Sequence, residues 1–329
     1  TDSVQWVRYY PPLSDARAEG EVPTAEQCRR LPAPSNETCL TERAEVLLRL
    51  GRIEDARRNI DEAIALNSGN GDANALRAII QIAGNDKVAA LESASAATVA
   101  APEAYRAWLA LSYAQQAVFR LEQALATAEK ARALEPKSSL VSARVAELLL
   151  SLGRIKEAEA AARSAVDANP LEARAHTVLG FVHLAQIDTK AARADFQAAI
   201  ERDSFDPLAR LGLGLAIIRD GKLALGREQI EIAVALDPTN SLLRSYVGKA
   251  YYEENSKERD ALASNLFSSA KELDPNDPTP WFYGSILKDS QTRPAEALQD
   301  LDKSGDLNDD RAVYRSRLLL DQDLAARNA

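Results

Sequence analysis

The sequence is poor in the residues on which most catalytic and metal sites depend. Its 329 residues include two histidines, two cysteines and no methionine, and aromatic residues make up only 5%. Two cysteines without further ligands do not make a tetrahedral zinc site, which takes four protein ligands. No Ser-His-Asp or Cys-His grouping can be assembled from residues close together in the sequence. We therefore expect no enzyme active site, no metal and no cofactor in this chain.

Two stretches resemble metal sites without completing them. His176 and His183 are seven residues apart, so they share one face of a helix, but no third ligand accompanies them. Residues 300–308 resemble the start of an EF-hand calcium loop, but its twelfth place holds Arg311 where the loop needs a bidentate glutamate. We expect both stretches to be ordinary helix.

Basic charge and long apolar runs are also scarce. The formal net charge is −9 and the pI is about 5.1. A nucleic-acid backbone needs a basic stripe, so we expect no nucleic-acid partner. The longest apolar run, Leu211–Ile218, is far shorter than the roughly 20 residues of a membrane span, so we expect no direct membrane span. The chain does not begin with methionine and shows no signal-peptide pattern at Thr1, which predicts a processed product or a segment of a longer protein.

What the sequence does contain is a period of 34 residues. Eight repeats follow one another from Glu37, and only the seventh is longer, by three residues that we place between its two helices, within Glu253–Arg259. The repeats are 37–70, 71–104, 105–138, 139–172, 173–206, 207–240, 241–277 and 278–311. A fixed period of this size is typical of a stacked solenoid.

Small residues recur at two places of every repeat. The twentieth place holds Ala56, Ala90, Ala124, Ala158, Ala192, Gly226, Ala263 and Ala297. The twenty-seventh holds Ala63, Ala97, Ala131, Ala165, Ala199, Ala233, Ala270 and Ser304. Apolar residues spaced by three and four run through each repeat twice, with a break at glycines such as Gly153 and Gly221 and a proline after the second run. Each repeat is therefore predicted to be an antiparallel helix pair, with small residues where helices approach closely.

This pattern resembles the tetratricopeptide repeat, a helix-turn-helix unit of about 34 residues. Trp108 and Trp281 match the family's fourth-place aromatic, and Tyr251 and Phe267 match its eleventh and twenty-fourth places. Gly180, Gly214 and Gly248 match its small eighth place. The resemblance implies an all-α, right-handed superhelical solenoid over residues 37–311. Residues 312–329 are then the first helix of an incomplete ninth repeat or a capping helix.

In the family, side chains at the second, fifth, ninth and twelfth places of the first helices line a groove that receives a peptide or helix. The resemblance therefore implies a largely apolar groove here, with aromatic anchors. Its lining is predicted to include Ile79, Ile82, Arg106, Leu109, Tyr113, Leu150, Arg174, Phe181, Leu184, Leu211, Leu215, Tyr252 and Phe282. The alternative is that several of these side chains are half-buried between neighbouring helices.

Residues 1–36 do not fit the repeat and are expected to form an N-terminal arm or cap. Cys28 and Cys39 lie on either side of a proline-rich turn. They are either joined by a disulfide that pins the arm, which predicts an oxidising compartment, or free buried thiols of a cytosolic protein. The stretch from Val4 to Pro12, with Trp6, Tyr9 and Tyr10, resembles the segment before repeat arrays in large bacterial envelope proteins.

Three functions remain open from the sequence. The first is a protein-binding scaffold of the periplasm or cell envelope, part of a secretion or polysaccharide-export protein. The second is a cytosolic adaptor. The third is the repeat region of an enzyme whose catalytic domain lies outside this chain. In each of them the partner is a protein, a peptide or another segment of the same polypeptide.

Overall fold

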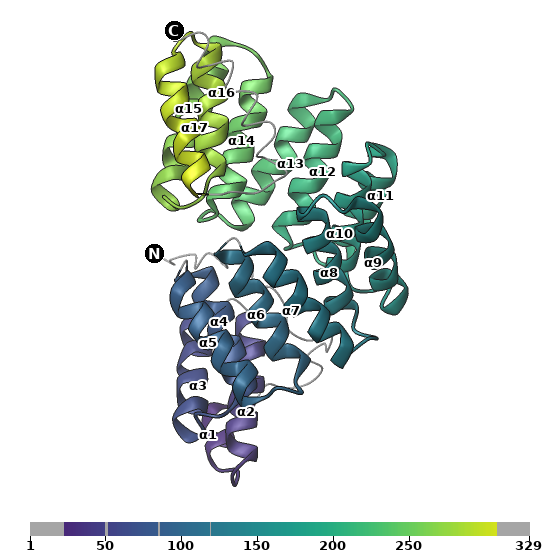
Figure 1. The fold of residues 1–329 in the computed structure, drawn as a ribbon, viewed down its shortest axis with the longest axis vertical. Coiled ribbons are helices and arrows are strands. Elements are labelled where there is room, and N and C mark those ends of the chain that lie inside the picture. The colour runs from purple at the N-terminus through teal and green to yellow at the C-terminus, as the bar shows by residue number, and fades with distance from the viewer. Residues whose placement is uncertain (1–22, 50–51, 85, 119, 308–329) are drawn as a thin grey trace. The chain divides into compact units, whose positions relative to one another are not determined.

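The computed structural model describes residues 23–49, 52–84, 86–118 and 120–307, and these ranges contain seventeen α-helices and no strand (Figure 1). The helices of the N-terminal half are α1 Ala25–Arg29, α2 Ser35–Arg49, α3 Ile53–Leu66, α4 Gly71–Ala83, α5 Lys87–Ala100, α6 Tyr105–Ala117, α7 Leu121–Leu134, α8 Ser139–Ser151 and α9 Ile155–Ala168. Those of the C-terminal half are α10 Ala173–Ala185, α11 Thr189–Arg202, α12 Pro207–Arg219, α13 Leu223–Leu236, α14 Ser241–Glu253, α15 Lys257–Leu273, α16 Thr279–Ser290 and α17 Pro294–Leu307. The fold is therefore all-α, as the repeat pattern predicts.

The chain forms two compact units. Of the described residues, the first comprises those of 23–150 and 156–178, and the second comprises those of 151–155 and 179–307. In each unit, helices of one repeat pack against each other, as α4 does with α5 and α12 with α13, and the first helix of the next repeat packs beside them, as α6 does against α4 and α5. Six of the first helices begin at the residue that opens a repeat: Gly71, Tyr105, Ser139, Ala173, Pro207 and Ser241.

The small residues of the repeat lie where helices pack most closely. Every alanine at the twentieth and twenty-seventh places is fully buried, and Ser304, the one serine among them, is 2% exposed. A larger side chain at such a place overpacks the core, which typically destabilises a protein by about 1–3 kcal/mol. The period of the sequence therefore reflects the contacts between helices.

The turns whose fifteenth place lies in the described part of the chain share one backbone conformation there. Gly153 and Gly221 have φ values of 73° and 81° there, as helix-ending glycines often do. Ile187, Asn255 and Thr292 occupy the same place in other repeats and have φ values of 68°, 52° and 57°. The fold thus imposes a left-handed residue at this place even where the sequence supplies a β-branched side chain, which disfavours it.

The three extra residues of the seventh repeat lie in its second helix, which corrects the sequence prediction. The sequence prediction places them in the turn within Glu253–Arg259, but the connection from α14 to α15 is three residues long, as is that from α12 to α13. Helix α15 has 17 residues, whereas α13 has 14. Ser256 caps α15, its side chain accepting a hydrogen bond from the Arg259 backbone N–H. The added residues therefore extend the N-terminal end of the helix.

Glycines of the second compact unit allow two unusually close contacts. Phe196 of α11 is fully buried against Gly180 of α10 and Gly212 of α12, where added Cβ atoms would collide with its ring. Gly214 of α12 and Gly226 of α13 face each other: a Cβ on Gly226 would lie 2.5 Å from the Gly214 carbonyl oxygen. These helices approach each other more closely than alanine would allow.

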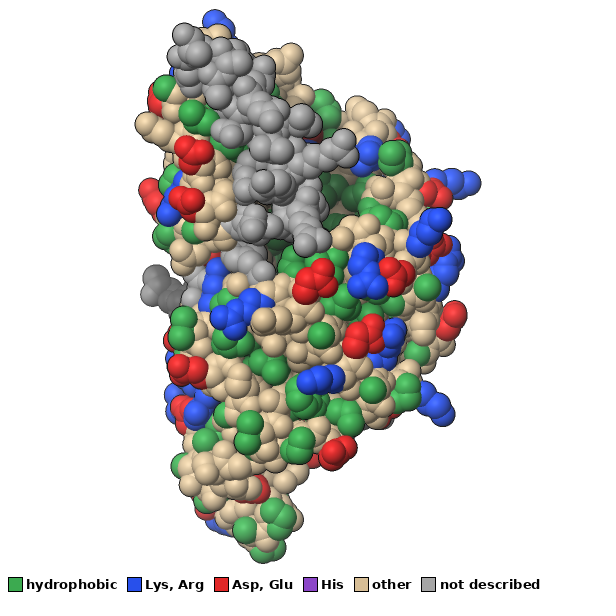
Figure 2. All heavy atoms as spheres, viewed as in Figure 1, with side chains coloured by type: hydrophobic (Ala, Val, Ile, Leu, Met, Phe, Trp, Pro, Cys, Tyr) green, Lys and Arg blue, Asp and Glu red, His purple; other side chains and the backbone are tan. Residues whose placement is uncertain are grey.

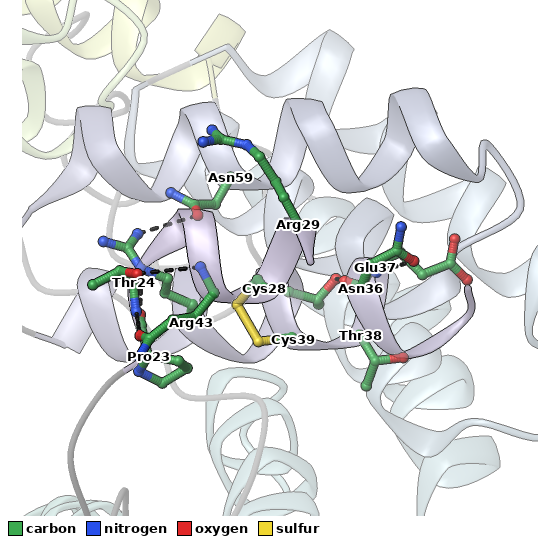
Figure 3. Close-up of a disulfide and its surroundings, with 12 residues drawn as sticks. Pro23, Thr24, Cys28, Arg29, Asn36, Glu37, Thr38, Cys39, Arg43 and Asn59 are labelled. Carbon is green, nitrogen blue, oxygen red and sulfur yellow. Dashed lines mark hydrogen bonds between the residues drawn. A yellow bond between two sulfur atoms is a disulfide. The ribbon is translucent and has the colours of Figure 1, made fainter. Parts of the chain in front are cut away.

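The described N-terminal residues form a cap on the first repeat (Figure 3). Helix α1 packs on α2, and Cys28 of α1 and Cys39 of α2 form a disulfide with a Cα–Cα distance of 5.4 Å. The Arg43 Nε–H donates to the Pro23 carbonyl oxygen at 2.8 Å, and Arg29 donates two hydrogen bonds to the Glu62 carboxylate, at 2.6 and 2.9 Å. The predicted aromatic arm around Trp6 and the expected last helix at residues 312–329 lie outside the described residues.

Candidate partner-binding surface

Five apolar residues of the predicted groove are buried, which corrects the sequence prediction for them. Ile79, Leu109 and Tyr113 belong to the hydrophobic core of the first compact unit, and Leu184 and Leu211 belong to cores of the second. The most exposed of the five, Leu184, is 9% exposed. Their places lie on the correct helix face, but the small residues between neighbouring helices bring the helices close enough to cover these side chains.

The two arginines of the predicted groove are engaged in ion pairs within the first compact unit. Arg106 of α6 pairs with Glu45 of α2 and lies 3.6 Å from the Asp72 carboxylate of α4, so it joins three successive first helices. Burial lowers the pKa of Arg106, but Glu45 and Asp72 outweigh it and raise the pKa overall. The sequence carried a signal for this contact, because Glu45 stands at a ninth place and Arg106 at a second place of the same helix face.

Arg174 belongs to a second ionic cluster, around Glu147. The Glu147 carboxylate accepts from Arg174 at 2.9 and 3.0 Å and from Arg144 at 3.1 Å. Arg144 is fully buried; it also donates to the Ser112 side chain at 2.9 Å and lies 4.0 Å from the centroid of the Tyr113 ring. Burial alone would raise the pKa of Glu147, but Arg174 and Arg144 hold it below its usual value of 4.5. This face of the first compact unit is therefore closed by internal ion pairs.

The remaining six residues of the predicted groove are half-buried. Ile82 and Leu150 lie on the first helices of the first compact unit, and Phe181, Leu215, Tyr252 and Phe282 lie on those of the second. Phe181 meets Phe196 edge to face, with ring centroids 4.9 Å apart.

Half-buried apolar side chains are most numerous on the first helices of the second compact unit. At the groove places of α12, α14 and α16 these are Leu208, Leu215, Ile218, Leu242, Tyr252, Phe282 and Ile286, which we call the apolar face. Residues three and four apart lie on one side of a helix, so the members on each helix share a side. Among its polar neighbours, Lys249 lies at a ninth place and forms an ion pair with Glu253.

The aromatic rings behind the apolar face pack against one another. Tyr246 meets Tyr283 edge to face at 5.7 Å between centroids, and Tyr283 stacks on Phe267 at 6.4 Å. Burial raises the pKa of both tyrosines. Tyr283 is therefore held between two other rings, and the three rings form a rigid support.

The histidines have structural partners. His176 lies 2.9 Å from the Pro170 carbonyl oxygen, and His183 Nδ1 lies 2.6 Å from the Asp195 carboxylate. Within the part of the chain that the structure describes, no group of three or more His, Cys, Asp or Glu side chains could hold a metal ion. None of the described helices combines the length and apolarity that a membrane crossing requires. Over the face drawn in Figure 2, acidic and basic side chains are interspersed.

Solved structures share this fold. The APC/C hetero-tetramer Cut9–Hcn1 superposes with a TM-score of 0.64 and 16% identity, over 92% of this chain and 58% of that one. This chain thus spans little more than half the length of that protein. A tetratricopeptide repeat protein from Parabacteroides merdae gives a TM-score of 0.53 and 18% identity, over 77% of this chain and 99% of that one. The human IFIT1 dimer with PPP-AAAA gives a TM-score of 0.57 and 16% identity, over 84% of this chain and 74% of that one.

The sequence matches no curated protein significantly. The family model described as tetratricopeptide repeat matches residues 41–105, 145–207 and 178–241. These matches fall on the helix pairs and on the period of buried alanines described above. The chain therefore belongs to the tetratricopeptide repeat family.

Proposed function

We propose that this chain is a protein-binding scaffold and that its apolar face receives a peptide or helix of a partner protein. The observation that carries the proposal is the contrast between the two compact units. In the first, the charged groove residues are paired internally and Ile79, Leu109 and Tyr113 are covered. In the second, seven apolar side chains at groove places keep part of their surface in solvent.

The chemistry of the face defines its occupant. Its members are leucine, isoleucine, tyrosine and phenylalanine, so it fits a segment that presents apolar side chains at every third or fourth residue of a helix, or at alternate residues of an extended strand. Aromatic side chains on a rigid support are typical anchors of protein interfaces.

The binding proposal can be tested with peptides selected against the immobilised protein from a displayed library. Replacing Leu215 or Tyr252 with Ser removes apolar contact area from the face, so binding of the selected peptides should weaken at least tenfold, about 1.4 kcal/mol. The matched control is Leu225→Ser on α13, since Leu225 is an exposed leucine of a second helix. Peptides that bind all three variants as tightly as the native protein would contradict the proposal.

We further propose that the protein works in the periplasm or cell envelope of a bacterium. The Cys28–Cys39 disulfide supports this compartment, because disulfides persist in oxidising environments. Thiol titration of the denatured, unreduced protein from its native host should then find no free thiol. Two free thiols per chain would instead favour the cytosolic adaptor.

A further inference from the structure

Two lysines of the second compact unit converge on one buried carboxylate. Lys271 of α15 and Lys288 of α16 each place Nζ 2.9 Å from Oδ2 of Asp300, on α17. Asp300 is only 4% exposed, while the side chains of Lys271 and Lys288 keep 19% and 25% of their surface in solvent. One carboxylate thus faces two ammonium ions that solvent can still reach.

The contacts of the two ammonium groups leave N–H donors unused. Lys271 Nζ lies 4.0 Å from the ring centroid of Trp281, a cation–π contact. Each ammonium group carries three N–H donors, more than the single Asp300 oxygen can accept. Donors held close to a surplus of positive charge favour an anionic ligand.

The electrostatics of Lys271 agree with this geometry. Burial lowers the pKa of Lys271, Asp300 raises it, and the nearby ammonium of Lys288 lowers it again. Within the described part of the chain, Arg293 also interacts electrostatically with Asp300 and Glu296 with Lys288, and Arg293 and Glu296 form an ion pair with each other. The five groups therefore comprise three cations and two anions.

We propose that Lys271 and Lys288 together bind an oxyanion, a phosphate or a carboxylate, with Asp300 holding the two side chains in position. This site is separate from the apolar face, because its residues stand at the eleventh, twenty-third and twenty-eighth places of their repeats rather than at groove places. The ligand is either free phosphate or the acidic side chains of a protein partner. The proposal does not depend on peptide binding to the apolar face.

The test is protection of individual amines in the full chain, measured by reductive methylation and mass spectrometry. One arm adds inorganic phosphate and the other adds a hexaglutamate peptide, both at constant ionic strength. Methylation of Lys271 and Lys288 should slow in at least one arm, and that arm identifies the source of the oxyanion. The exposed Lys222 is the internal control and should react at an unchanged rate.

Two variants make the test sharper. Lys288→Gln removes one of the two cations, so the ligand concentration that half-protects Lys271 should rise about tenfold, which corresponds to about 1.4 kcal/mol. Asp300→Asn removes the internal carboxylate while keeping its shape. The ligand concentration that half-protects Lys271 should therefore fall about tenfold. Circular dichroism shows whether each variant is folded. Three results would overturn the proposal. Methylation of Lys222 could slow as much as that of Lys271 and Lys288, or methylation of Lys271 and Lys288 could fail to slow in the native protein. Full protection of Lys271 in folded Lys288→Gln would be the third.

Discussion

Replacing Gly226 with alanine separates two opposite expectations. The other seven repeats hold alanine at this place, so the repeat pattern suggests that Gly226→Ala restores the common residue. Alanine also favours a helix interior by about 1 kcal/mol over glycine. On the sequence alone, the substitution should stabilise the protein.

The structure predicts the reverse. The new Cβ would lie 2.5 Å from the Gly214 carbonyl oxygen, 2.5 Å from Ile218 Cγ1 and 2.9 Å from the Ile218 backbone nitrogen. Two of these atoms are backbone, so no rotamer change relieves the contact and α12 must move away from α13. Overpacking of this kind costs about 3 kcal/mol at the upper end of its range. After the gain in helix propensity, the free energy of unfolding should fall by about 2 kcal/mol.

Guanidinium denaturation followed by far-ultraviolet circular dichroism measures the overall change. Repeat proteins can open locally, so hydrogen exchange of the α12 and α13 amides should accompany it. Gly84→Ala is the control, because a Cβ at that helix end would meet no atom closer than 3.4 Å. A Gly226→Ala protein with a higher midpoint and unchanged exchange in α12 would refute the reasoning.

Three further predictions concern the turn, the cap and the ionic cluster. Ile187→Gly should raise the free energy of unfolding, measured by denaturation, by up to about 1 kcal/mol. A left-handed residue with a Cβ costs about 1–2 kcal/mol, and little packing is lost because Ile187 is exposed. A lower denaturation midpoint would contradict this. The double variant Cys28→Ser, Cys39→Ser should lower the free energy of unfolding by up to about 3 kcal/mol, the value expected for a loop of this length. Hydrogen exchange in α1 should become faster. Unchanged exchange would show that the disulfide does not hold the cap. The Glu147 carboxylate has a lowered pKa, so its ion pairs stabilise the protein above pH 4.5 and this contribution is lost as the pH falls through the folded pKa. Glu147→Gln should therefore be less stable than the native protein at pH 7, and the difference should shrink in acid denaturation; a constant difference would argue against the assignment.

Helix pairs and their register could be predicted from the sequence because they depend on contacts that recur in every repeat. Ala131 and Ala165 occupy the same place in successive repeats and are both fully buried. A contact made eight times leaves a pattern that a single sequence reveals.

Groove exposure could not be predicted in the same way. Leu109 and Phe282 hold equivalent fifth places, but Leu109 is fully buried and Phe282 is half-buried. The difference depends on the neighbouring helices, which the place in the repeat does not specify. The cluster of Lys271, Lys288 and Asp300 was missed for a related reason: its members come from three helices and occur together only once along the array.

The longer helix α15 also bears on how the chain avoids misfolding. Repeats of equal length have similar interfaces, so a helix pair can pack against a repeat that is not its neighbour in sequence. Such misassembly is characteristic of repeat proteins. Three more residues lengthen α15 by about 4.5 Å. Its Arg259 binds Glu254 at 2.8 Å, and Glu254 also binds Arg227 of α13 at 2.6 Å. Among the eight repeats only the seventh is longer than 34 residues, so it differs from every other repeat and disfavours pairing out of register.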